Sequence, residues 1–170
     1  HALSLTGPAV FQAGTISGLN GQLDALTVRG STVNLSAVSI SNFEASDTIT
    51  INGTTAANTL TGSARRDTIN ADNGDDLLKG GGGADSLYGG SGKDTASYAG
   101  SAAVQINLAS NVAKGGGAEG DTFSRIQSLI GSGFSHTLIG HAADNKIEGG
   151  AGPHKPRRGP RAGQRGGGTR

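Results

Sequence analysis

Single apolar residues recur at a fixed interval in the middle of this chain. Leu60, Ile69, Leu78, Leu87 and Ala96 stand nine residues apart, mostly between polar neighbours. One apolar residue flanked by polar ones is typical of a short β-strand with a single inward face. Five such strands at one period predict a repeat architecture.

An acidic or amide residue precedes each predicted strand at the same period. These residues are Asn58, Asp67, Asp76, Asp85 and Asp94, and glycine stands two residues before each of the last three. Glycine permits the positive φ angles of tight turns, so each copy is predicted to be a turn followed by a strand. The unit Gly-Gly-x-Gly-x-Asp-x-apolar-x has copies at 53–61, 62–70, 71–79, 80–88 and 89–97.

One copy buries nothing alone, but two copies form a flattened coil, and stacked coils build a thin core. The turns that begin at 53, 71 and 89 would then lie along one edge, and those at 62 and 80 along the other. Each gap between stacked turns brings together two carboxylates and several carbonyl oxygens, which is unfavourable without a cation. Calcium fits this oxygen-rich site, whereas magnesium keeps its water and zinc prefers His or Cys.

With these features, the chain resembles the RTX, or hemolysin-type, calcium-binding repeat family. The resemblance is specific over 62–97 and looser over 53–61, where Asn58 replaces the acid. It implies an all-β fold, a right-handed parallel β-roll with calcium between turns two repeats apart. It also implies an extracellular location, because such repeats belong to larger bacterial proteins that leave the cell by type I secretion.

The predicted calcium ligands are the carboxylates and turn carbonyls of the repeat. Asp67 is the weakest of the acids, because Arg65 and Arg66 stand where glycine would help the turn. Asp121 follows a glycine-rich stretch that imitates the repeat with its glycine displaced, and it is a further, weaker candidate. The predicted metal ligands are Asp67, Ala71, Asn73, Gly74, Asp76, Gly80, Gly82, Gly83, Asp85, Gly89, Ser91, Gly92 and Asp94.

Four further segments flank the repeat array at 53–97. Residues 1–52 alternate apolar and polar positions and are predicted to form irregular solenoid rungs. Residues 98–130 are a β-rich connection with a strand at Val104, Ile106 and Leu108. Residues 131–152 look like a degenerate second array that binds calcium poorly, because His136 and Asn145 replace the acid.

The segment 153–170 is predicted to be a disordered basic tail. Residues 1–152 carry 8 basic and 13 acidic side chains, a balance of −5, whereas the tail carries +6. The abrupt change after Gly152 is typical of a reading-frame error in a GC-rich gene, and a natural basic tail is the alternative. The tail has no aromatic residue for base stacking, so no nucleic-acid partner is predicted.

Composition narrows the possible functions. With 31 glycines and 34% hydrophobic residues among 170, a deep packed core is not expected. The chain has no Cys, so disulfides are excluded, and it has no apolar run long enough to span a membrane. The only partners predicted are calcium ions, the larger parent polypeptide and an extracellular partner that the sequence does not identify.

No catalytic or organic-cofactor site is predicted. The glycines at 115–120 match a dinucleotide fingerprint but follow polar Lys114, and neither G-x-S-x-G nor H-E-x-x-H occurs. His136 and His141 are expected to be exposed turn residues. The predicted function is calcium binding by a module that folds when calcium binds, and the segment is not an enzyme. The alternatives are an accessory module of a secreted hydrolase or other enzyme, and part of a repetitive surface adhesin.

Overall fold

The fold is described from a computed structural model. It covers residues 2–6, 14–17, 25–41, 44, 46–142, 145–149 and 154–157. Within these residues the regular elements are short strands and one turn of 3-10 helix, η1 (Gly116–Ala118). The strands are β1 (Ala2–Thr6), β2 (Gly14–Ser17), β3 (Ala25–Arg29), β4 (Thr32–Asn34), β5 (Val38–Ser41), β6 (Thr48–Asn52), β7 (Thr59–Thr61), β8 (Asp67–Asn70), β9 (Leu77–Lys79), β10 (Ser86–Tyr88), β11 (Thr95–Ser97), β12 (Gln105–Asn107), β13 (Val112–Lys114), β14 (Thr122–Ser124), β15 (Ser128–Ile130), β16 (His136–Ile139), β17 (Lys146–Glu148) and β18 (His154–Arg157).

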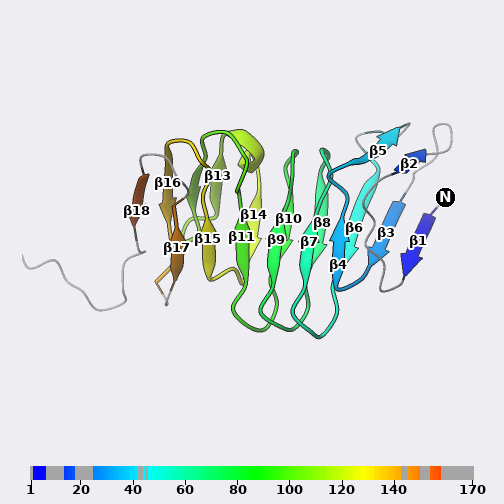
Figure 1. Cartoon of the computed structure of the whole chain (residues 1–170), viewed down its shortest axis with the longest axis horizontal. Helices are drawn as coiled ribbons and strands as arrows, with labels where there is room; N and C mark the ends of the chain where they lie inside the picture. The colour runs from blue at the N-terminus through cyan, green and yellow to red at the C-terminus, as the bar shows by residue number, and fades with distance from the viewer. Residues whose placement is uncertain are drawn as a thin grey trace, which may run out of the picture.

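Two long sheets of parallel strands face each other along the length of the molecule (Figure 1). One has the order β1-β3-β6-β8-β10-β14, and the other has the order β4-β7-β9-β11-β15-β17. The chain alternates between them through the array, so each strand pairs with the strand two copies away, as Leu78 does with Leu60 and Leu87 with Ile69. This is the predicted all-β parallel roll.

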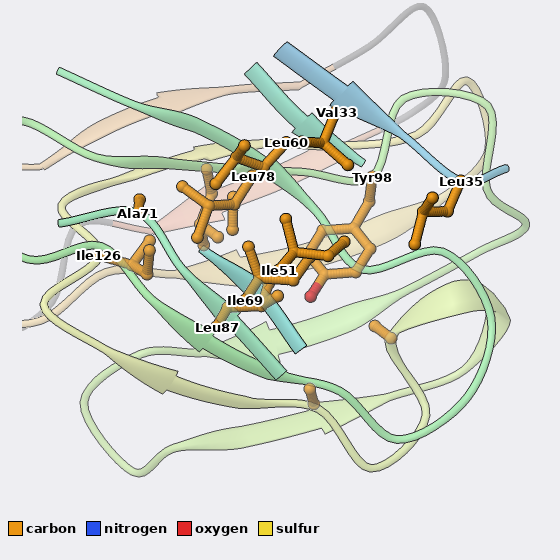
Figure 2. Close-up of a cluster of buried hydrophobic side chains, with 14 of the residues drawn as sticks. Val33, Leu35, Ile51, Leu60, Ile69, Ala71, Leu78, Leu87, Tyr98 and Ile126 are labelled. Atoms are coloured by element: carbon orange, nitrogen blue, oxygen red, sulfur yellow. The ribbon is translucent and has the colours of Figure 1, made fainter. Parts of the chain in front are cut away.

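The core is the thin layer between the two sheets. The apolar residues at the nine-residue period, Leu60, Ile69, Leu78, Leu87 and Ala96, are all at most 1% exposed, as predicted. Figure 2 shows several of them together with the ring of Tyr98. Burying an aliphatic side chain of this size contributes about 1.5–3 kcal/mol. Each rung therefore contributes little to the folding free energy by itself, and a stable fold requires many stacked rungs.

The strands before the array continue the same core. Leu26 and Val28 of β3, and Ile49 and Ile51 of β6, are buried, and β6 pairs with β8 of the array. The alternating apolar residues of β3 and β6 therefore form rungs of the stack. Near the other end of the array, β14 and β15 pair with β10 and β11.

A hairpin interrupts the stack after β11. Its strands β12 and β13 are antiparallel, and β12 also pairs in parallel with β16. The predicted strand at 104–108 is thereby confirmed, with Val104 and Ile106 buried. As a result, β16 does not stack on β14 but belongs to a separate sheet of order β13-β12-β16-β18.

Part of the segment predicted to be a disordered tail forms a strand. Residues of β18 pair in parallel with β16, from His136 opposite His154 to Ile139 opposite Arg157. The rest of the tail lies outside the described residues, and the proposed segment boundaries stay a prediction. Among the described residues, no helix has the length and apolar character needed to cross a membrane.

Candidate metal centre

The aspartates of the array form two columns, one along each edge of the stack. In the first column, the backbone N–H of Asn58 donates to Asp76 Oδ1 at 2.7 Å, and that of Asp76 donates to Asp94 Oδ1 at 3.1 Å. In the second column, the Asp67 N–H donates to Asp85 Oδ1 at 2.8 Å. Partners lie 18 residues apart, as two nine-residue copies require.

The turns that carry these aspartates stack in the predicted pairs. The Gly74 N–H donates to the Ser91 carbonyl at 2.9 Å, and the Ser91 N–H donates to the Asp72 carbonyl at 2.9 Å. Asn73 and Ser91 also form a parallel bridge. On the other edge, the Gly82 N–H donates to the Ser63 carbonyl at 3.0 Å. The third-position residues predicted as ligands, Asn73, Gly82 and Ser91, therefore join one turn to the next.

Glycine is required at two kinds of position in these turns. Gly74, Gly83 and Gly92 have φ of 122°, 105° and 133°, where a side chain is strained. Gly62 and Gly89 lie under the folded-back carboxylates, since a Cβ would be 2.7 Å from Asp67 Oδ2 or 2.5 Å from Asp94 Oδ2. The glycines of the motif thus shape the turn and make room for the acid.

The column aspartates are buried, and burial is the main cause of the raised pKa of three of them. Asp67, Asp76, Asp85 and Asp94 are at most 2% exposed. Loss of hydration raises the pKa of Asp67 to about 6 and that of Asp85 to about 8. Burial, and then the neighbouring carboxylate of Asp76, raise the pKa of Asp94 to about 6. Asp67, Asp85 and Asp94 therefore resist ionisation unless a cation lies beside them.

Each of these four aspartates has one oxygen that is buried and lacks a hydrogen-bond partner among the described residues. The atoms are Asp67 Oδ1, Asp76 Oδ2, Asp85 Oδ2 and Asp94 Oδ2. A buried charged group without a partner costs several kcal/mol, whereas a cation beside it offsets that cost. Hard carboxylate and carbonyl oxygens are the ligand set that calcium prefers. The residues present therefore fit a calcium ion.

The aspartates of the two columns do not form a dense group of acids. No three His, Cys, Asp or Glu side chains gather around one point in the part of the chain that the structure describes. Successive carboxylates instead approach in pairs, close enough that the Asp67 charge acts on Asp85 and the Asp76 charge on Asp94. Backbone carbonyls lie beside them, because a Cβ at Gly62 would meet both the Gly80 oxygen and Asp67 Oδ2. A cation held here would take a large share of its ligands from the backbone.

Two side chains beyond the repeat array extend the columns. The Asp85 N–H donates to Asp121 Oδ1 at 2.8 Å, and the Asp94 N–H donates to Gln127 Oε1 at 2.7 Å. The sequence singles out Asp121 only as a weak candidate and does not point to Gln127. The signal for Asp121 is its displaced glycine turn. Nothing in the periodicity reveals Gln127, because the hairpin shifts it out of register.

Asp121 differs from the other acids because both of its oxygens accept hydrogen bonds. Its Oδ2 accepts from the Tyr98 hydroxyl at 2.6 Å. Burial raises the pKa of Asp121, and burial followed by the Asp121 charge raises that of Tyr98 well above 10. The Tyr98 ring packs edge-on against Phe123, with centroids 6.5 Å apart. Tyr98 thus provides the hydrogen-bond donor for the last carboxylate of the second column.

The degenerate turns hold His136 and Asn145 at the position of the acid. A Cβ at Gly131 would lie 2.6 Å from His136 Nε2, and one at Gly140 would lie 2.5 Å from Asn145 Cγ. His136 is 4% exposed, and its Nδ1 lies 2.8 Å from the Phe134 carbonyl oxygen. The expectation of an exposed His136 is wrong, because the ring fills the space that the aspartate has in other turns. His141 is half-buried.

Comparison with known proteins identifies the repeat. The family described as RTX calcium-binding nonapeptide repeat (4 copies) matches residues 61–96 and 128–152. The chain carries RTX repeats. The second matched segment includes the turns of His136 and Asn145, so the same repeat model matches both the first array and the degenerate one. RTX repeats are a calcium-binding structural module.

No curated protein and no solved structure matches the chain. The ligand roles predicted for individual residues of the RTX repeats therefore rest on the geometry above and stay predictions.

Proposed function

We propose that the two columns bind calcium between successive turns and that this binding completes the folding of the β-roll. The observation that carries the proposal is the set of buried carboxylate oxygens, one on each of four aspartates, that have no hydrogen-bond partner in the part of the chain that the structure describes. Asp76 and Asp94 would hold an ion on one edge, and Asp67 and Asp85 would hold one on the other. Burial removes the water that would stabilise these carboxylates, and the positive charge of calcium would stabilise them instead.

Binding and folding are then one equilibrium. A metal-free stack must either protonate its buried aspartates or bury unpaired charge, and both lower the stability of a fold with a thin core. A ligand that binds only the folded chain stabilises it by mass action. Extracellular calcium modules bind with Kd of about 10⁻⁴ to 10⁻³ M. Such an affinity suits a chain that stays unfolded in a calcium-poor cytoplasm and folds after export.

The proposed role is structural rather than catalytic, in a secreted or cell-surface protein of which this chain forms part. The family supports the extracellular setting, because RTX proteins are typically secreted. A calcium-dependent spacer needs no substrate pocket, and its product is a rigid stack that positions whatever adjoins it.

Calcium titration of the 170-residue chain after chelation tests the proposal. Isothermal titration should show binding at millimolar calcium, and circular dichroism should show a cooperative gain of β signal over the same range. Magnesium at equal concentration should have a much smaller effect, because it gives up water reluctantly and requires strict octahedral geometry. A chain with no heat of binding and an unchanged spectrum would refute the proposal.

A further inference from the structure

The first turn of the first column contains a nitrogen atom surrounded by oxygens. Asn58 Nδ2 lies within hydrogen-bonding distance of the Thr54 carbonyl at 3.1 Å, the Ala71 carbonyl at 3.3 Å and Asp76 Oδ1 at 2.9 Å. The Ala56 carbonyl is a fourth acceptor, and the two hydrogens of the amide are shared among these oxygens. Two of these oxygens come from its own turn and two from the turn stacked beside it. The nitrogen therefore lies in the gap between turns 53–58 and 71–76.

Neighbouring donors determine which way the amide faces. Asn58 Oδ1 accepts from the Thr54 backbone N–H at 3.1 Å and from its hydroxyl at 3.0 Å. A backbone N–H can only donate, so the oxygen of the amide must be on this side. Asn58 is only 3% exposed. With its oxygen on the Thr54 side, its NH₂ group must face the four oxygens.

Asp67 shows the same arrangement with an acid in place of the amide. Its Oδ2 accepts from the Ser63 N–H at 2.8 Å and from the Ser63 hydroxyl at 3.0 Å, as Asn58 Oδ1 accepts from Thr54. Asp67 Oδ1 is therefore the counterpart of Asn58 Nδ2. It is buried and has no hydrogen-bond partner among the described residues. Where Asn58 has a donor, Asp67 has an acceptor that needs one.

We propose that the Asn58 amide replaces a calcium ion in this gap and so closes the first column at its N-terminal end. The inference rests on the proposed function, since it identifies a gap of that column that binds no metal. Both a cation and an NH₂ group offer positive character to converging oxygens, but only the amide does so without calcium. The first gap is thus assembled before metal binds, and it gives the following turns a surface on which to stack.

The variant Asn58→Asp tests this role in the full chain. It restores the acid of the repeat and removes the NH₂ donors, so the gap should become a calcium site. Isothermal titration should count one more calcium ion per chain than in wild type. In chelator, the urea midpoint should fall below that of wild type, and excess calcium should restore it. Ala57→Asp is the matched control, because it adds the same charge on an exposed neighbour and should add no ion.

Asn58→Leu completes the comparison, because it has a similar volume but neither donates nor ligates. It should lower the urea midpoint in chelator and in calcium alike. Equal calcium counts for wild type and Asn58→Asp, or an Asn58→Asp chain that calcium fails to restore, would overturn the inference alone if wild type binds calcium. If wild type binds no calcium, the proposed function fails first and this inference fails with it.

Discussion

Replacing Asp85 with asparagine is expected to change stability in opposite directions with and without calcium. Asp85 is 1% exposed, and burial raises its pKa from 3.8 to about 8. The metal-free fold therefore holds this carboxyl mostly protonated at pH 7. Because pH 7 is roughly three units above the ordinary pKa of an aspartate, taking up this proton on folding costs about 4 kcal/mol, at 1.36 kcal/mol per unit.

Asparagine avoids this cost because it is neutral at every pH. Its oxygen can still accept the Asp67 N–H that Asp85 Oδ1 now accepts at 2.8 Å. Its NH₂ group needs acceptors in return, which reduces the gain, so we expect the metal-free chain to be stabilised by about 2–4 kcal/mol. In calcium, the loss of a charged ligand should make the variant less stable than wild type.

Urea unfolding at pH 7, in chelator and in excess calcium, measures both effects. Asp75→Asn is the control, because Asp75 lies in a turn of the same array but is exposed, and its Oδ1 accepts the Lys93 N–H at 2.8 Å. The control should change stability by less than about 0.5 kcal/mol in either condition. A loss of stability for Asp85→Asn in chelator would show that the buried carboxyl is favourable without a cation, and the reasoning from burial would be wrong.

Three further outcomes follow from the same columns. In chelator, stability should be greatest near pH 4 and fall as the pH rises toward 8, because the aspartates with raised pKa favour folding only while protonated; urea midpoints across pH would contradict this by rising. Asp76→Ala and Asp94→Ala should be non-additive by about 0.5–3 kcal/mol in calcium, whereas simple additivity would mean that they share no ion. Tyr98→Phe should lower the unfolding free energy by about 1–3 kcal/mol in chelator, because Asp121 loses a buried donor, and an unchanged value would deny the bond its role.

The repeat array is the part of the molecule that the sequence predicts best. Its strands and turns recur at one period, so the position of one copy determines those of its neighbours. Burial of Leu78 and Leu87, and the pairing of Asp76 with Asp94, follow directly from that period. Where local pattern and stacking agree at every step, no long-range information is needed.

The ends of the columns could not be predicted in the same way. Asp121 is 36 residues beyond Asp85 rather than 18, because the β12–β13 hairpin lies between them. The acceptor that Gln127 provides and the donor that Tyr98 provides depend on how that hairpin folds back. The role of Asn58 was also hidden, since a missing acid in a motif suggests a weaker site rather than an amide bonded to the surrounding oxygens.

The hydrogen bonds between the column residues all run one way, and this gives each column a direction. Each column residue donates its N–H to a side-chain oxygen of the column residue in the turn that follows. The Lys93 N–H, which lies beside the first column, donates the other way, to Asp75 of the turn before. Any residue except proline can be such a donor, so the first turn of a column is free to lose its acid, as at Asn58. The last turn is not, because a buried N–H before it would lose its acceptor. Sequence drift should therefore erode these arrays from their N-terminal end, while the C-terminal end must keep an oxygen-bearing side chain even where the repeat itself has ceased.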